Sequence, residues 1–349
     1  MKWVRQNLFS DLVNSALTLA CLALIAAILV PFLDWALFSA VFHGGSAEPC
    51  RAPGAGACWP FVTHNIERFV YGPFPDEEHW RINLILIIGA VALIAAAIPQ
   101  APAKRFNVLF LLIAYPLIAA VFLIGGRGGL ALVPTVEWGG LMLTLIVAIT
   151  GIVLSLPLGI VLALGRRSEL PVVRVLCTVF IEVWRGVPLI TVLFMATVML
   201  PLFVPEGVTL DKLLRVLIGV ALFSAAYMAE VVRGGLQAIP KGQFEAADAL
   251  GLGYWKSMGL IIMPQALRHV IPGIVNTFIG LFKDTTLVLI VGLFDLLGMV
   301  QFMLTNPNWA SSQTAATGYL FVGFVFWVFC FAMSRYSQAV ERRLDTGAR

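Results

Sequence analysis

The chain has 349 residues, of which 60% are apolar and only 12% carry a charge. Soluble domains carry about 25% charged residues, so this composition cannot supply the polar surface that water requires. The sequence therefore indicates an integral membrane protein that lies in a lipid bilayer. Its 23 basic and 19 acidic residues give a net charge of +4, which is too small to indicate a nucleic-acid partner.

Apolar runs long enough to cross a bilayer as a helix occur eight times, which predicts an all-α, polytopic membrane protein. The first run exceeds the core of an ordinary signal peptide and seven others follow it, so we expect it to remain as a helix. The seventh contains the polar string Lys283-Asp284-Thr285-Thr286. We interpret this string as the centre of one span, because a hairpin there would move the basic C-terminal residues outside. The expected spans cover about residues 14–38, 82–98, 107–125, 138–165, 175–201, 212–235, 273–303 and 315–338.

The basic residues indicate the orientation of these spans. The connections rich in lysine and arginine all fall on one side of an alternating topology, including the long connection at about residues 236–272. The positive-inside rule assigns that side to the cytoplasm, so both termini are expected inside and the loop at about 39–81 outside. These basic residues are Lys2, Arg5, Lys104, Arg105, Arg166, Arg167, Arg174, Lys241, Lys256, Arg268, Arg342 and Arg343.

A glycine-rich run at residues 125–129 divides the chain into two expected parts. Residues 1–130 would form an accessory N-terminal region of three helices with the outer loop. Residues 131–349 hold the other five spans. Most of the polar chemistry lies in this second part, at residues 182–188, in a cytoplasmic loop at about 236–264 and at 283–286.

Cys50 and Cys58 differ from the other three cysteines because they lie in the outer loop, on either side of a Gly/Pro/Ala-rich stretch. A disulfide would persist there in an oxidising compartment, and two free thiols fit the sequence equally well. The four histidines lie in or near loops without an HExxH spacing, so no metal site is expected.

The string from Pro240 to Gly251 predicts a short helix in the cytoplasmic loop, because proline suits an opening turn and glycine suits a stop. The small side chains of its alanines would allow another protein to approach closely, and Glu245 and Asp248 could bind basic residues of that protein. An amphipathic helix lying on the inner leaflet would instead need a basic polar face and bulky apolar anchors. The loop is therefore expected to dock with a protein.

Residues 245–251 read EAADALG, and after nine intervening residues Ile261, Ile262, Met263 and Pro264 follow. This pattern resembles the EAA signature of the membrane subunits of ATP-binding-cassette (ABC) importers, although the signature usually ends in Leu-Pro and Met263 departs from it conservatively. The strings AYMAEVVRGGLQAIPKGQ, EVWRGVPL and LFKDTTLV are similar to those of the polar amino-acid branch. The three leading helices and the aromatic outer loop resemble general L-amino-acid permease subunits of Gram-negative bacteria.

The resemblance implies a five-helix core of the type I ABC importers in the inner membrane of a bacterium. It also implies two copies of a separate ATPase that bind ATP and Mg²⁺, a periplasmic amino-acid-binding protein, and a second permease subunit, for which a sibling chain is favoured over a second copy. ATP is not expected on this chain, because Gly251–Ser257 lacks the glycine that precedes the lysine of a phosphate-binding loop. The resemblance assigns the ATPase contact to Glu245, Ala246, Ala247, Asp248, Gly251 and Pro264.

Charged residues inside the spans are candidates for the substrate pathway, since charge near the bilayer centre is costly. Counted along straight helices, Lys283 and Asp284 lie roughly 15 Å into their span and Arg185 lies at a similar depth. An amino acid is a zwitterion, so Arg185 or Lys283 could bind its carboxylate, and Asp284 or Glu182 its ammonium group. Alternatively, Glu182 could neutralise Arg185 on its own helix, and Lys283 and Asp284 could pair across helices.

Two further groups of polar side chains accompany these charges. Thr285 and Thr286 could add hydroxyl contacts to substrate, although a threonine that bonds its own helix backbone is the simpler interpretation. Tyr227, Glu230 and Arg233 fall in the last turns of their span, where an inner gate or a subunit contact is expected. Gly186 and Pro188 would loosen the helix beside Arg185.

Two other classes of function were weighed against an importer subunit. A stand-alone secondary transporter of amino acids should show repeat symmetry or an acidic or histidine relay inside its spans, and neither is evident. A membrane-embedded enzyme lacks candidates, because no GxSxG or HExxH motif supplies catalytic residues. The sequence thus favours a transporter subunit without catalytic residues of its own.

Overall fold

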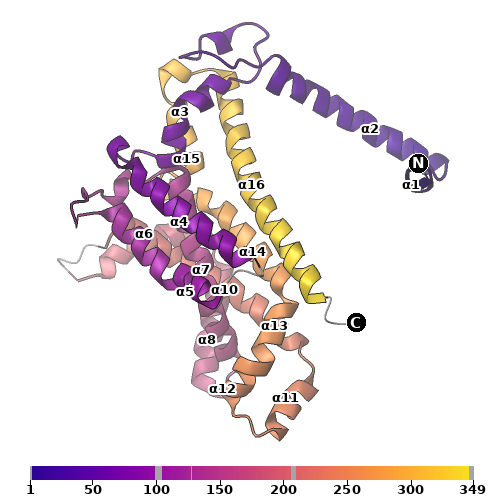
Figure 1. Ribbon diagram of the computed structural model, residues 1–349, viewed down its shortest axis with the longest axis vertical. Helices are drawn as coiled ribbons and strands as arrows, with labels where there is room; N and C mark the ends of the chain where they lie inside the picture. The colour runs from indigo at the N-terminus through magenta and orange to yellow at the C-terminus, as the bar shows by residue number, and fades with distance from the viewer. Residues whose placement is uncertain (1, 99–103, 127, 206–209, 346–349) are drawn as a thin grey trace. The chain divides into compact units, whose positions relative to one another are not determined.

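The computed structural model describes residues 2–98, 104–126, 128–205 and 210–345 (Figure 1), and within these ranges it is helical without any strand. In the described part of the chain, seven helices are long and apolar enough to cross a membrane, and a bent pair supplies an eighth crossing if it is one span. The predicted class of polytopic helical membrane protein is confirmed. The α-helices are α1 (Lys2–Asn7), α2 (Leu12–Leu33), α3 (Trp59–Tyr71), α4 (His79–Ala97), α5 (Lys104–Leu109), α6 (Tyr115–Ile124), α7 (Gly140–Arg166), α8 (Pro171–Gly186), α9 (Leu189–Phe194), α10 (Lys212–Ala238), α11 (Lys241–Ala249), α12 (Tyr254–Ser257), α13 (Met263–His269), α14 (Ile271–Asp284), α15 (Leu296–Leu304) and α16 (Ser312–Asp345).

Two of the expected spans are not single straight helices over the predicted residues. The run at 175–201 is broken between Gly186 and Leu189, and its two halves are bent by 105°. Val187 is extended there, as expected before a proline, and Pro188 precedes the first turn of α9. The span expected at 273–303 ends at Val291, because Gly292 adopts a left-handed conformation that stops the helix, and α15 is a separate short helix.

Contacts along the chain define two compact units, Met1–Ile66 with Val300–Gly323, and Glu67–Met299 with Phe324–Arg349. The structural units therefore do not follow the expected division near residue 130. The run that was expected to mark this division contains Arg127, which lies outside the described residues. The assignment of residues 1–130 as an accessory region and 131–349 as an importer core stays a proposal about function.

In the first unit, the outer loop is folded against the segment that leads into α16. Cys50 and Cys58 form a disulfide, so the alternative of two free thiols is wrong. The backbone N–H of Cys58 donates to Oγ1 of Thr317 at 2.7 Å, and Arg51 donates to the carbonyl of Ala310 at 3.1 Å. By contrast, α2 is apolar after Thr18 and has no buried residue, as expected for a helix that faces lipid.

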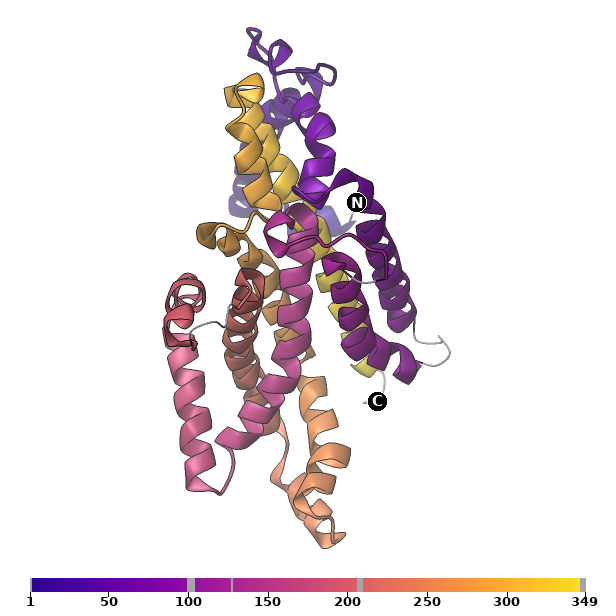
Figure 2. The ribbon, with the colours of Figure 1, turned by 90° about the vertical axis from the view of Figure 1, so that its left-hand side faces the viewer.

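In the second unit, α7 and α10 form the central pair and lie side by side in both views (Figures 1 and 2). Gly159 permits their close approach, because a Cβ there would lie 2.8 Å from side-chain atoms of Met228. One apolar cluster surrounds the first halves of these helices and includes Leu143 and Val216. A second surrounds their last turns and includes Val232 and Ile262.

Candidate coupling site

The cytoplasmic loop folds as the expected short helix, α11, at the end of the unit opposite to the start of α7 (Figure 2). Pro240 occupies the N-cap position instead of the first helical turn. The helix stops as predicted, because Gly251 has a φ of +69°. The N–H of Gly251 donates to the carbonyl of Asp248, and that of Leu252 to the carbonyl of Ala247, which is the hydrogen-bond pattern of a Schellman motif.

The faces of α11 separate the residues that were expected to dock. Glu245, Ala246 and Asp248 are exposed, as are Gly251 and Pro264 beyond the helix. Ala247, in contrast, is completely buried. Its assignment to the contact with a partner is therefore corrected, because a fully buried methyl group holds α11 against its own chain.

Sequence reasoning missed the apolar part of the exposed surface. Leu250 is 74% exposed, Trp255 75% and Leu260 72%, and all three belong to the same cytoplasmic loop. Clusters of exposed large apolar side chains typically mark a contact with a protein or a membrane. In the sequence, nothing distinguishes these residues from apolar residues that are buried in the core. We call Glu245, Ala246, Asp248, Leu250 and Trp255 the docking face.

Two contacts connect α11 to the neighbouring helices. The guanidinium of Arg167, directly after α7, lies 5.7 Å from the ring centroid of Phe244, within the range of a cation–π interaction. Gln265 of α13 donates a hydrogen bond of 3.1 Å to the side chain of Gln243. Phe244 also packs against the apolar cluster at the ends of α7 and α10. These contacts attach α11 to the end of α7.

A cluster of five charged side chains lies beside this attachment and is centred on Glu230 of α10. Glu230 binds Arg166 at 2.7 Å and Arg233 at 2.7 Å, and Arg185 lies 3.6 Å away. Arg166 also binds Glu182 at 2.8 Å. Glu230 is only 16% exposed, so its charge depends on these partners. Three arginines from α7, α8 and α10 converge on one carboxylate.

This geometry corrects two expectations for Glu182 and Arg185. The two side chains do not neutralise each other, because Glu182 binds Arg166 and Arg185 approaches Glu230. The estimated depth of Arg185 assumed a straight helix, whereas α8 is bent by 105° from the segment that follows. Arg185 shares Glu230 with Arg166, so it lies at the level of the last turn of α7. Tyr227 lies beneath the Arg185 guanidinium, at 5.7 Å from its ring centroid.

The polar string at 283–286 is separate from this cluster. Within the described residues, no ion pair forms at Lys283 or Asp284, so the expected pairing across helices is not found. Thr285 is buried, and its hydroxyl donates to the carbonyl of Phe282 at 2.8 Å. Thr286 donates likewise to the carbonyl of Lys283. Both threonines therefore bond their own helix backbone, as the simpler interpretation had it.

Comparison with known proteins places these features in a family. Residues 155–346 match the family described as binding-protein-dependent transport system inner membrane component. An Escherichia coli protein named inner membrane amino-acid ABC transporter permease protein YhdY is 53% identical over 99% of this chain and 94% of its own length. The chain belongs to this family of inner-membrane transport components.

Another relative of this transport component comes from Rhodobacter capsulatus. It is named glutamate/glutamine/aspartate/asparagine transport system permease protein BztC and is 39% identical over 99% of this chain and 93% of its own length. A solved structure described as an amino acid ABC transporter with histidines has 27% identity and a TM-score of 0.51, and covers 58% of this chain and 92% of that one.

The transport component resides in the inner membrane and is a transporter subunit, not an enzyme. Its family match begins inside α7 and includes α11, the cluster at Glu230 and the polar string at 283–286. The family implies a binding-protein partner and an ATPase partner that uses ATP. The helices α2 to α6 precede the matched region. Both α11 and the charged cluster thus lie in the part of the chain that the family model matches.

Proposed function

We propose that this chain is the permease subunit of an ATP-driven importer of polar L-amino acids. The observation that carries the proposal is the docking face, which comprises exposed small and acidic residues of α11 and the exposed apolar residues Leu250 and Trp255 after it. The α11 helix is attached to α7 through Arg167 and Phe244. The two relatives are named as permeases for amino acids, and these names support the substrate class. A periplasmic binding protein delivers the substrate, and ATP and Mg²⁺ bind on two partner ATPase subunits.

Docking at α11 is the step by which the ATPase moves the membrane helices. When the ATPase closes, it displaces α11, and the Phe244–Arg167 contact passes that displacement to the end of α7. Arg166, the last residue of α7, carries it to Glu230 and hence to α8 and α10. Glu230, Arg233 and Tyr227 then act as an inner gate or a subunit contact, because the ion pairs that join three helices have to shift together.

The substrate pathway is proposed near Asp284. Asp284 lies in the middle part of a membrane span and has no ion-pair partner among the described residues, so it can accept the ammonium group of an amino acid. Lys283 is exposed and supplies a cation for the carboxylate. Glu182 and Arg185 are already engaged with Arg166 and Glu230, which favours a role for them in the gate.

The assembly proposed for the importer pairs this chain with a sibling permease, with both termini and α11 in the cytoplasm. A stand-alone secondary transporter is not supported, because the family works with a binding protein. The experiment is transport in proteoliposomes that contain the assembled importer and the binding protein. Uptake should require the ATPase and should stop with Glu245→Arg, whereas Glu67→Arg, an exposed glutamate outside the loop, should transport normally. Uptake by the chain alone would refute the proposal.

A further inference from the structure

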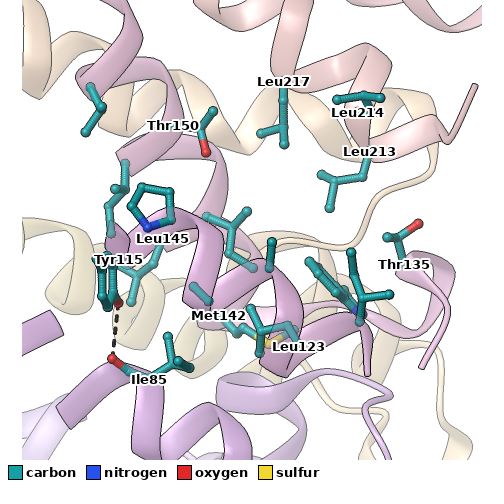
Figure 3. A pocket seen from close by; sticks show the side chains of 18 of the residues that line it. Ile85, Tyr115, Leu123, Thr135, Met142, Leu145, Thr150, Leu213, Leu214 and Leu217 are labelled. Carbon is teal, nitrogen blue, oxygen red and sulfur yellow. Dashed lines mark hydrogen bonds between the residues drawn. The ribbon is translucent and has the colours of Figure 1, made fainter. Parts of the chain in front are cut away.

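A pocket of about 500 Å³ lies between α4 and α6 on one side and α7 and α10 on the other (Figure 3). Its wall is mostly apolar and includes Ile85, Leu123, Met142 and Leu217. The hydroxyl of Tyr115, a polar group in this wall, donates to the carbonyl of Ile85 at 3.1 Å. The pocket lies among helices that cross the membrane, so the molecules that can enter it come from the bilayer.

The two ends of the pocket differ in polarity. Its polar end lies just before the start of α7 and α10, where Trp138 and Asp211 belong to the lining. From Met142 to Leu154, α7 lines the pocket over about 18 Å, which is comparable to the thickness of one leaflet, about 15 Å. Away from this end, the interior is largely apolar, with hydroxyls of Thr150 and Tyr115 in its wall. A pocket with a polar outer end and a long, largely apolar interior has the polarity profile of a lipid.

An unsatisfied donor at the polar end indicates which chemical group would bind there. Trp138 is only 5% exposed, and its indole Nε1 is buried without a hydrogen-bond partner. A buried N–H without an acceptor is costly, so a ligand that supplies an oxygen there is stabilised. The carboxylate of Asp211 lies at the same end and would repel the carboxylate of a free fatty acid, so a fatty acid is disfavoured. An ester carbonyl provides an oxygen without that charge.

We propose that this pocket binds one acyl chain of a membrane phospholipid, with its ester group at Trp138. A bound chain would fill the space between the accessory helices and the importer core, where a void would forfeit packing contacts. The site would make α4 and α6 part of a lipid-dependent packing unit with α7 and α10. This inference is independent of which substrate is carried.

The test is photolabelling of the assembled importer in vesicles of phosphatidylethanolamine and phosphatidylglycerol. The vesicles contain a trace of phosphatidylethanolamine whose acyl chain bears a diazirine, and peptides are mapped by mass spectrometry. We expect a label on Met142, which is only 3% exposed and is reached from the pocket. Ala119→Phe, which fills the pocket, should lower this label about tenfold. Ala90→Phe, on an exposed position of α4 outside the pocket, should leave it unchanged.

Three results would overturn the proposal. The first is label confined to exposed positions such as Leu93 and Leu117 in the unmodified protein, which would also be the result if a partner chain filled the pocket. The second is a label on Met142 that survives in folded Ala119→Phe protein. The third is labelling by diazirine palmitic acid but not by the phospholipid. If the Ala119→Phe variant does not fold, the position of the label in the unmodified protein still tests the proposal.

Discussion

The Nη1 atom of Arg166 lies 2.7 Å from Oε1 of Glu230, which joins the last residue of α7 to α10. The next residue, Arg167, covers the ring of Phe244 on the docking helix. Two consecutive arginines therefore connect the cytoplasmic helix and the charged cluster. Because they are covalent neighbours, a displacement of α11 that moves one of them also moves the other.

Removing the contact between α7 and α11 should uncouple docking from transport. We predict that Arg167→Ala keeps ATPase binding but lowers amino-acid uptake per ATP hydrolysed, because a cation–π contact of about 0.5–1 kcal/mol is lost. Arg174→Ala is the matched control, since Arg174 donates to the carbonyl of Ser168 and lies away from Phe244. Equal coupling ratios in both variants and the unmodified protein would contradict this role.

Neutralising the centre of the charged cluster should destabilise the protein. In Glu230→Gln, three arginines lose the negative charge that they share, and we expect about 1–3 kcal/mol of destabilisation and a lower thermal midpoint of the detergent-solubilised protein. Glu182→Gln should cost less, because Glu182 is 54% exposed and binds only Arg166. If the two variants melted alike, Glu230 would not be the centre of the cluster.

The two central alanines of the motif should respond differently to enlargement. Ala247→Leu adds volume at a completely buried position and should cost about 1–3 kcal/mol of stability. Ala246→Leu is exposed, so the thermal midpoint should stay unchanged while binding of the ATPase weakens. Thermal melting and a pull-down with the ATPase subunit separate the two effects, and the reverse pattern would show that α11 is rotated relative to this description.

We expect opposite effects from substitutions at Asp284, the proposed pathway residue, and at its neighbour Thr285. Asp284→Asn should abolish uptake while assembly and ATPase binding persist, because the negative charge that would pair with the substrate ammonium is lost. Thr285→Val should transport normally, since the Thr285 hydroxyl is buried and satisfied by its own helix. Transport assays on purified, assembled complexes measure both. Failure of Asp284→Asn to assemble would instead indicate a structural role.

Asp295 predicts a pH dependence of stability. It lies between the span that ends at Val291 and α15, is fully buried, and accepts a hydrogen bond from the N–H of Gly298 through Oδ1, while Oδ2 has no partner. Burial raises its pKa from 3.8 to about 6. The folded state thus retains a proton that the unfolded state releases, so stability should fall as pH rises from about 4 to 6 and then level off.

The size of this fall should be about 2–3 kcal/mol. Asp295→Asn keeps the cap of α15, because an asparagine side chain can accept the same hydrogen bond, and it removes the titration. Thermal midpoints between pH 4 and pH 7 should decline for the unmodified protein relative to the variant. Parallel curves would show that Asp295 does not titrate in this range.

The spans and the short cytoplasmic helix could be predicted because their signals are local. Apolar length determines a crossing, and Gly251 ends α11 by its own backbone preference. The end of the seventh crossing was missed, because the apolar run continues past Gly292 and only the turn there reveals the stop. Pro188 signalled a loosened helix, but the size of the bend depends on packing that the sequence does not display.

The partners of the charged residues could not be predicted from spacing. Glu182 and Arg185 are three residues apart, which favours a pair on one helix, yet each binds a residue of another helix. The burial of Ala247 could not be predicted either, because an alanine in the motif fits both a contact with a partner and a contact with the core of its own chain. Trp138 and the pocket beside it depend on four helices that are distant in sequence.

Site-directed crosslinking tests the central proposal most directly. In the assembled importer, Ala246→Cys on α11 should form a crosslink to the ATPase subunit with a short bifunctional thiol reagent, and the yield should change with ATP. Glu67→Cys, outside the loop, should form none. A crosslink that is absent at position 246, or a cysteine there that only reagents added to the periplasmic side can modify, would contradict the assignment of α11 as the docking helix.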